Sequence, residues 1–133
     1  AFCVASWAVL DVTQARAEYS TIYEYGRAGG AEAARIVRDS THPNAVIVAP
    51  REIDWLTSRK ATLSTQLAGP DGTPAQWLAF FEANKPAAVV LPTKEDTRYT
   101  QVTRNPAVLA QMAACYTPPR TIGSYVLWIR TCK

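Results

Sequence analysis

Two short polar segments carry the side chains best suited to binding or acid–base chemistry. The first follows the apolar run "AVIVAP" and contains Arg51, Glu52 and Asp54. The second follows the apolar run "PAAVVLP" and contains Lys94, Glu95, Asp96, Arg98 and Tyr99. Carboxylates can transfer protons and cations can hold anionic ligands. In open parallel sheets, ligands bind beyond the carboxyl ends of the strands, which is where both segments would lie. The alternative interpretation is that these segments are polar only because loops are solvated.

Motifs for nucleophilic or cofactor chemistry are missing from the sequence. There is no G-x-S-x-G elbow and no P-loop, and "GRAGG" at 26–30 lacks the spacing of a dinucleotide-binding loop. The single histidine, His42, precedes a proline at a predicted helix end, where a capping or surface position is more common than a catalytic pair with Cys115. We therefore expect no cofactor.

The cysteines also bear on the compartment. The chain has 3 cysteines, which are Cys3, Cys115 and Cys132. None of them forms a C-x-x-C pair, so we expect no metal site. Cys115 and Cys132 could form a disulfide in an oxidising compartment, which would leave one thiol over. Whether they pair stays open from the sequence alone.

Composition indicates an ordinary globular domain. The chain has 133 residues, of which 48% are hydrophobic and 19% charged, so it suits one domain with its own core. The formal net charge is +3, and the basic residues are scattered along the chain rather than clustered. Nucleic-acid binders usually show a basic stripe or patch. We therefore expect no nucleic-acid partner.

The first ten residues, "AFCVASWAVL", contain no charge. This run is too short to span a bilayer, which needs about 20 apolar residues. It is either a buried segment or the end of a membrane helix. We expect residues 1–26 to form an N-terminal arm and residues 27–133 to form a single domain.

The rest of the chain alternates helical and buried-strand patterns. We expect helices over 31–40 and after the capping residues Thr73 and Asn105, each of which precedes a proline. Apolar β-branched runs near positions 46 and 89 predict central parallel strands. "ATLS" predicts a weak strand, and the last residues predict an antiparallel hairpin. The fold class is therefore α/β: a small three-layer sandwich with a mainly parallel sheet and a C-terminal antiparallel edge hairpin.

Three predicted helices place particular side chains in the core. In the short helix after the first strand, Ile53, Trp55 and Leu56 are expected to face inward. In the helix after Thr73, the buried set is Trp77, Leu78 and Phe81. In the helix after Asn105, it is Val108, Leu109 and Met112.

The order of these motifs resembles a known kind of domain. It consists of the helix "AEAARIVRDS", a turn with Pro43, Ala45 and Val46, and the element Trp55-Leu56-Thr57-x-Arg59-Lys60, followed by "AAVVLP" and "SYVLWIR". Residues 27 to 131 are similar to the extracytoplasmic C-terminal domain of polytopic GT-C type glycosyltransferases, the group of dolichyl-phosphate-mannose protein mannosyltransferases and aminoarabinose transferases.

The resemblance implies an activity for the parent enzyme but no catalytic residue in this chain. Such enzymes transfer a sugar from a polyprenyl-phosphate donor outside the cytoplasm, and their catalytic carboxylate lies in an early loop between membrane helices. The implied partners are the transmembrane region of the same polypeptide and, through Arg59 and Lys60, lipid head groups or the polyprenyl-phosphate sugar. A solvated basic pair beside an edge strand is the simpler interpretation of Arg59 and Lys60.

Two further hypotheses remain. The chain could be a secreted or membrane-tethered α/β module that binds a small ligand at the strand ends through Arg51, Asp54, Lys94, Asp96 and Arg98. It could also be a small enzyme that uses the carboxylates of Asp54, Glu95 and Asp96, which would need two of them within catalytic reach.

Overall fold

Two apolar strands lie side by side at the centre of the sheet. In the computed structural model, which describes residues 26–63, 73–93 and 105–133, β1 (Val46–Ala49) runs parallel to β3 (Ala88–Pro92), with Ile47 opposite Ala88. Both strands are almost completely buried. The parallel pairing predicted from the two apolar runs is confirmed, because helices cover both faces of these strands.

The sheet has five strands in the order β2-β1-β3-β5-β4. Strand β2 (Lys60–Leu63) pairs parallel with β1 at one edge. On the other side, β5 (Tyr125–Ile129) runs antiparallel to β3, and β4 (Arg120–Ile122) closes that edge as the outer strand of a hairpin. The predicted hairpin is confirmed, with its inner strand next to the sheet centre.

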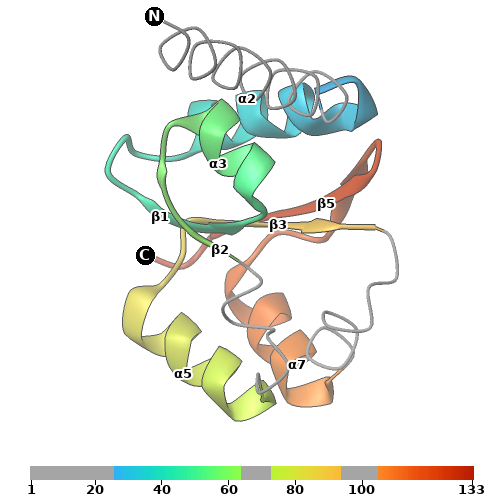
Figure 1. Cartoon of the computed structure of the whole chain (residues 1–133). Coiled ribbons are helices and arrows are strands. Elements are labelled where there is room, and N and C mark those ends of the chain that lie inside the picture. The colour runs from blue at the N-terminus through green and yellow to red at the C-terminus, as the bar shows by residue number, and fades with distance from the viewer. Residues whose placement is uncertain (1–25, 64–72, 94–104) are drawn as a thin grey trace, which may run out of the picture.

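Helices form a layer on each face of the sheet (Figure 1). The short π-helical turn η1 (Gly26–Gly30), α2 (Ala31–Ser40) and α3 (Arg51–Thr57) lie on one face, and α5 (Pro74–Asn84) and α7 (Pro106–Cys115) lie on the other. The predicted three-layer α/β sandwich is therefore confirmed. The predicted N-terminal arm, apart from its last residue, is outside the described ranges. Within those ranges, no helix combines the length and apolar character needed to cross a membrane.

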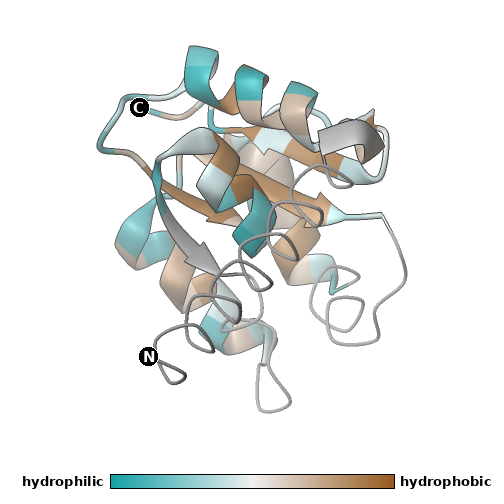
Figure 2. Cartoon of the chain, turned by 45° about the horizontal axis from the view of Figure 1, so that its top comes forward, coloured by the Kyte–Doolittle hydropathy of each residue, from teal (hydrophilic) through white to brown (hydrophobic). Residues whose placement is uncertain are grey.

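Strand alternation divides the interior into two cores. Ile47 and Ala49 of β1 pack with Ala33, Val37 and Ile53 on the side of α2 and α3. Val48 of β1 points to the opposite side, where the core contains Trp77, Phe81, Val108, Met112 and Tyr116. Figure 2 shows hydrophobic residues along the strands and hydrophilic ones on the outer turns of the helices. One strand thus contributes to both cores, because successive side chains point to opposite faces.

Both predicted helix starts are present. The hydroxyl of Thr73 accepts a hydrogen bond from the backbone N–H of Gln76, and the Gln76 side chain accepts one from the backbone N–H of Thr73. The side chain of Asn105 accepts from the N–H groups of Ala107 and Val108. These contacts satisfy amides that have no partner inside the helix, which fixes where α5 and α7 begin.

The inward positions expected for Trp55 and Leu109 are wrong. Trp55 is 42% exposed and Leu109 is 50% exposed. In α3 the buried face is set by Ile53 and Thr57, four residues apart, so Trp55 lies between them on the opposite side. In α7 the buried face is set by Val108 and Met112, and Leu109 lies about 100° around the helix from Val108.

Two glycines allow the β4–β5 turn to contact the turn before α2. Gly29 and Gly123 both have positive φ, 99° and 56°. The backbone N–H of Ser124 donates to the carbonyl of Ala28 at 2.7 Å. A Cβ on Gly29 would lie 2.6 Å from the carbonyl oxygen of Ile122, and one on Gly123 would overlap the carbonyl of Ala28. Only backbones without a side chain can approach so closely here.

Gly123→Ala should therefore lower the free energy of unfolding by about 3 kcal/mol, because a left-handed alanine is strained and its methyl group meets backbone that cannot move away. Denaturant unfolding measures this. The control is Thr121→Ala, an exposed change in the same hairpin that should alter stability by less than about 0.5 kcal/mol. Equal stability of the two variants would contradict the contact.

Candidate functional site

The first predicted polar segment does lie at the carboxyl end of β1. Arg51 is exposed, and its guanidinium lies over the ring of Trp55, 5.1 Å from the ring centroid. Asp54 is half-buried within α3, and its backbone carbonyl accepts from the Thr57 hydroxyl at 3.1 Å. The neighbouring Glu52 carboxylate accepts a hydrogen bond from the buried Tyr125 hydroxyl at 3.0 Å. Arg51 and Glu52 thus have intramolecular partners on this side of the sheet.

The second polar segment contains Lys94, Asp96 and Arg98, with Glu95 between them. All of these positions are outside the described residues. Strand β3 ends at Pro92, beside the carboxyl end of β1, so the chain enters this segment at the predicted edge. Convergence of the two segments on one ligand stays a prediction.

Arg59 holds helix α2 to the segment between α3 and β2. Its Nη2 donates to the backbone carbonyls of Arg38 at 3.0 Å and Thr41 at 3.2 Å. Its Nε donates to the hydroxyl of Thr41, also at 3.2 Å. That hydroxyl in turn donates to the carbonyl of Val37. A guanidinium with several donors in one plane is suited to this role, because the last carbonyls of a helix have no intrahelical partner.

Lys60, next in sequence, is exposed at the start of the edge strand β2. Because β1 and β2 are parallel, α3 must return the chain from the carboxyl edge to the amino edge of the sheet. Arg59 and Lys60 are therefore at the opposite edge from Arg51. The structure does not bring these candidate ligand-binding residues into one site.

Arg59→Ala should lower the free energy of unfolding by about 2 kcal/mol, because it leaves helix-end carbonyls without donors. Arg59→Lys should recover only part of this loss, since a single ammonium cannot reach the same acceptors. Thermal or denaturant unfolding gives the comparison. Lys60→Ala is the matched control and should be close to neutral. If Arg59→Ala had the same free energy of unfolding as wild type, these hydrogen bonds would not stabilise the fold.

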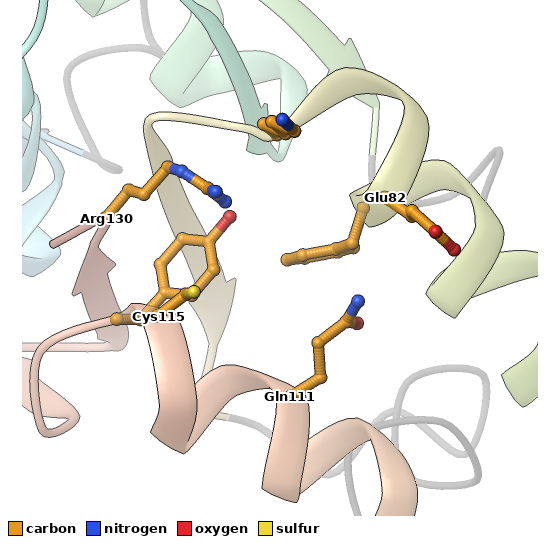
Figure 3. Close-up of a pocket in the computed structure, with 7 residues that line it drawn as sticks. Glu82, Gln111, Cys115 and Arg130 are labelled. Carbon is orange, nitrogen blue, oxygen red and sulfur yellow. The ribbon is translucent and has the colours of Figure 1, made fainter. Parts of the chain in front are cut away.

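The described residues contain a small pocket at the amino edge of the parallel strands (Figure 3). It lies between α5 and α7, has a volume of about 180 Å³, and is lined by Phe81, Glu82, Lys85, Gln111, Cys115, Tyr116 and Arg130. Lys85 precedes β3, and Arg130 follows β5, which runs antiparallel to β3. The two cations thus come from chain segments that meet at one edge of the sheet.

Tyr116 and Arg130 form one wall of this pocket. The Tyr116 hydroxyl donates to the carbonyl of Pro86 at 2.7 Å, and its ring packs against Phe81 with centroids 5.8 Å apart. The guanidinium of Arg130 lies over the Tyr116 ring, 5.8 Å from its centroid. Burial raises the pKa of the Tyr116 hydroxyl, and the neighbouring Arg130 opposes that rise. Tyr116 is therefore a neutral hydrogen-bond donor at ordinary pH.

Some of the charged and polar side chains around the pocket have no ion-pair or hydrogen-bond partner among the described residues. Within the described part of the chain, neither Lys85 nor Arg130 forms an ion pair. The carboxylate of Glu82 points away from the pocket, whereas the amide of Gln111 points into it (Figure 3). The Gln111 Oε1 atom is buried and has no hydrogen-bond partner. A buried acceptor without a donor is uncommon, because it costs about 1–3 kcal/mol.

The sequence contained one signal for this pocket. Cys115 and Cys132 form a disulfide, which places the residue after α7 beside the residues after β5. Tyr116 and Arg130 accordingly form an isolated antiparallel bridge. Pairing these cysteines in the sequence would have placed Tyr116 near Arg130. The site predicted from the sequence, at the carboxyl ends of the strands, would lie at the opposite edge of the sheet.

An apolar groove lies on the other side of α7. Its volume is about 440 Å³, and its walls include Leu109, Met112, Pro118, Pro119 and Trp128. Among the described residues that line it, none is charged. The exposed Leu109 thus belongs to an apolar surface rather than to the core.

Tyr116→Phe should reduce the free energy of unfolding by about 1–2 kcal/mol at neutral pH, because the Pro86 carbonyl loses its donor. The substitution should also change how the free energy of unfolding depends on pH above neutrality. The raised pKa means that the wild-type contribution is complete below the unfolded value of 10.0 and is lost as pH rises through the higher folded value. Phenylalanine does not titrate.

Denaturant unfolding between pH 8 and pH 11 should therefore show the difference between wild type and Tyr116→Phe shrinking above about pH 10. A difference that stays constant over this range would contradict the burial of the hydroxyl. Non-reducing conditions keep the disulfide intact in both proteins.

Among the described residues, no group of three or more histidine, cysteine, aspartate or glutamate side chains could hold a metal ion. No protein-family model matches this chain, and neither a curated protein nor a solved structure matches it significantly.

Proposed function

We propose that this chain is a non-catalytic domain of a membrane glycosyltransferase that transfers a sugar from a polyprenyl-phosphate donor. In this proposal the domain covers the transmembrane catalytic unit or helps to bind the acceptor, and it is located outside the cytoplasm. Its partners are the transmembrane region of the same polypeptide and lipid head groups or the polyprenyl-phosphate sugar.

The observation that carries the proposal is the disulfide between Cys115 and Cys132. Structural disulfides persist in oxidising compartments and are rare in the cytosol. This disulfide joins the end of α7 to the segment after β5, and Cys115 packs against the core on the side of α5 and α7. An extracytoplasmic location is what the family resemblance requires of such a domain.

The residues of the resemblance have structural roles, which supports a non-catalytic domain. Thr57 is completely buried, and its hydroxyl bonds the carbonyl of Asp54. Arg59 ties α2 to the start of β2. Such contacts stabilise the fold, and in this proposal the reaction takes place elsewhere in the parent enzyme. The motif therefore argues for a shared scaffold rather than for a shared active site.

Two surfaces offer contacts to a membrane-embedded partner. One is the apolar groove beside α7, which includes Leu109 and Trp128. The other is the exposed Trp55 with Arg51 on α3, at the opposite face of the sheet. Apolar surface on a soluble domain often marks an interface.

A second candidate function is a secreted or membrane-tethered module that binds a small ligand. The pocket between α5 and α7 favours it, because two cations, Lys85 and Arg130, line a largely apolar hollow and form no ion pair with a described residue. The two candidates differ in what precedes Ala1 in the gene. Several apolar segments of about 20 residues would support the glycosyltransferase, and a signal peptide directly upstream would support the binding module.

The purified 133-residue chain should show no sugar transfer from a polyprenyl-phosphate donor. The full-length protein should transfer the sugar, and removal of residues 27–133 should reduce that transfer. Radiolabelled donor and extraction of the product measure both. Turnover by the isolated chain would overturn the non-catalytic assignment, and full-length protein without any transfer would overturn the glycosyltransferase itself.

A further inference from the structure

Helix α3 exposes a tryptophan with an arginine lying over its ring, and a second arginine lies beside the helix. We infer that the surface made by Arg38, Arg51 and Trp55 (the α3 surface) contacts the anionic lipid surface of the membrane. The inference rests on the proposed function, because it names the lipid contact of a domain whose polypeptide also has a transmembrane region.

The side chain of Trp55 is suited to the boundary between lipid and water. It is 42% exposed, and its indole N–H has no hydrogen-bond partner within the described residues. Tryptophan is enriched at membrane interfaces because its ring is apolar and its N–H is a donor. The guanidinium of Arg51 lies 5.1 Å from the ring centroid. An arginine there can cover apolar surface with its stem and direct its charge to the lipid phosphates.

Arg38 and Arg51 both carry a positive charge that no acid of the described chain neutralises. Both are exposed, and neither forms an ion pair within the described residues. The guanidinium of Arg38, near the end of α2, donates to the backbone carbonyl of Leu56 in α3, which places this second cation beside α3. A basic residue close to an anionic lipid surface strengthens binding about fivefold.

The acids of the same helical layer do not cancel these two charges. On α2, Glu32 and Asp39 both pair with Arg35, at 2.7 Å and 3.2 Å. On α3, Glu52 and Asp54 are half-buried. Among the described side chains of α2 and α3, the fully exposed charges without an ion-pair partner are therefore positive, which favours an anionic partner.

The point at which the chain enters the described domain favours the same face. Gly26 begins η1, which lies against α2 and α3. In the proposed enzyme the transmembrane region precedes this point, so its connection reaches the domain on the face of α3 (Figure 1). The apolar groove beside α7 lies on the other face of the sheet. Chain direction and charge thus agree on the α3 surface.

The first test is flotation of the oxidised 133-residue chain with lipid vesicles. Vesicles of phosphatidylglycerol and phosphatidylcholine in equal parts should bind the chain at least about fivefold more strongly than vesicles of phosphatidylcholine alone. The difference should shrink as salt is added, because salt screens exposed charges. Equal binding to the two kinds of vesicle would overturn the inference.

Variants assign the binding to the α3 surface. Arg51→Gln and Trp55→Ala should each weaken binding to the anionic vesicles about fivefold, since each removes one contact with the lipid. Lys85→Gln is the matched control, because Lys85 is also exposed and loses the same charge but caps α5 on the other face. It should bind as wild type does. Unchanged binding in either α3 variant would overturn the inference, as would an equal loss in Lys85→Gln.

A second measurement needs no variant. Lipids with a spin label in the head group, placed in anionic bicelles, should broaden the indole N–H signal of Trp55 in NMR spectra. The signal of Trp128, in the groove beside α7, should stay sharp. Broadening of Trp128 as strong as that of Trp55 would overturn the inference, and so would the absence of broadening at Trp55.

Failure of this inference can be told apart from failure of the proposed function. Sugar transfer by the full-length protein, together with an unaffected Trp55 signal, would overturn the lipid contact alone. Absence of sugar transfer, together with broadening at Trp55, would overturn the glycosyltransferase alone.

Discussion

Burial of β1 and β3 on both faces is the constraint on which the rest of the structure depends. Ile47, Val48, Val89 and Val90 are completely inaccessible to solvent, so each strand requires a helical layer above and below it. Helices α2 and α3 provide one layer and α5 and α7 the other. The crossovers that return the chain between parallel strands then determine which edge each loop occupies. Burial therefore decides both the fold and the possible positions of a site.

The side-chain contacts at the amino ends of the parallel strands differ from those at their carboxyl ends. At the amino edge, Arg59 holds the end of α2, the Tyr116 hydroxyl bonds the Pro86 carbonyl, and the disulfide joins Cys115 to Cys132. These are long-range contacts between segments far apart in sequence, and the residues of two of them, Tyr116 and Cys115, line the pocket between α5 and α7. At the carboxyl edge, Arg51 and Glu52 instead contact Trp55 and Tyr125.

The glycosyltransferase proposal depends on the disulfide and on motif residues that build the scaffold, such as Thr57 and Arg59. The pocket between α5 and α7 is lined by residues that belong to no motif of the resemblance, among them Gln111 and Arg130.

The sequence alone determined the local and periodic features of this protein. Apolar β-branched runs, proline after Thr73 and Asn105, and turn residues near Gly123 were enough for the strands, the helix starts and the hairpin, because these depend on neighbours in the chain. Tertiary structure decided the rest. Trp55 and Leu109 were expected inside, yet packing turns other faces of α3 and α7 toward the sheet and leaves these two side chains exposed. The pocket residues were missed for the same reason: Lys85, Gln111 and Arg130 are distant in sequence, and only packing at one sheet edge brings them together.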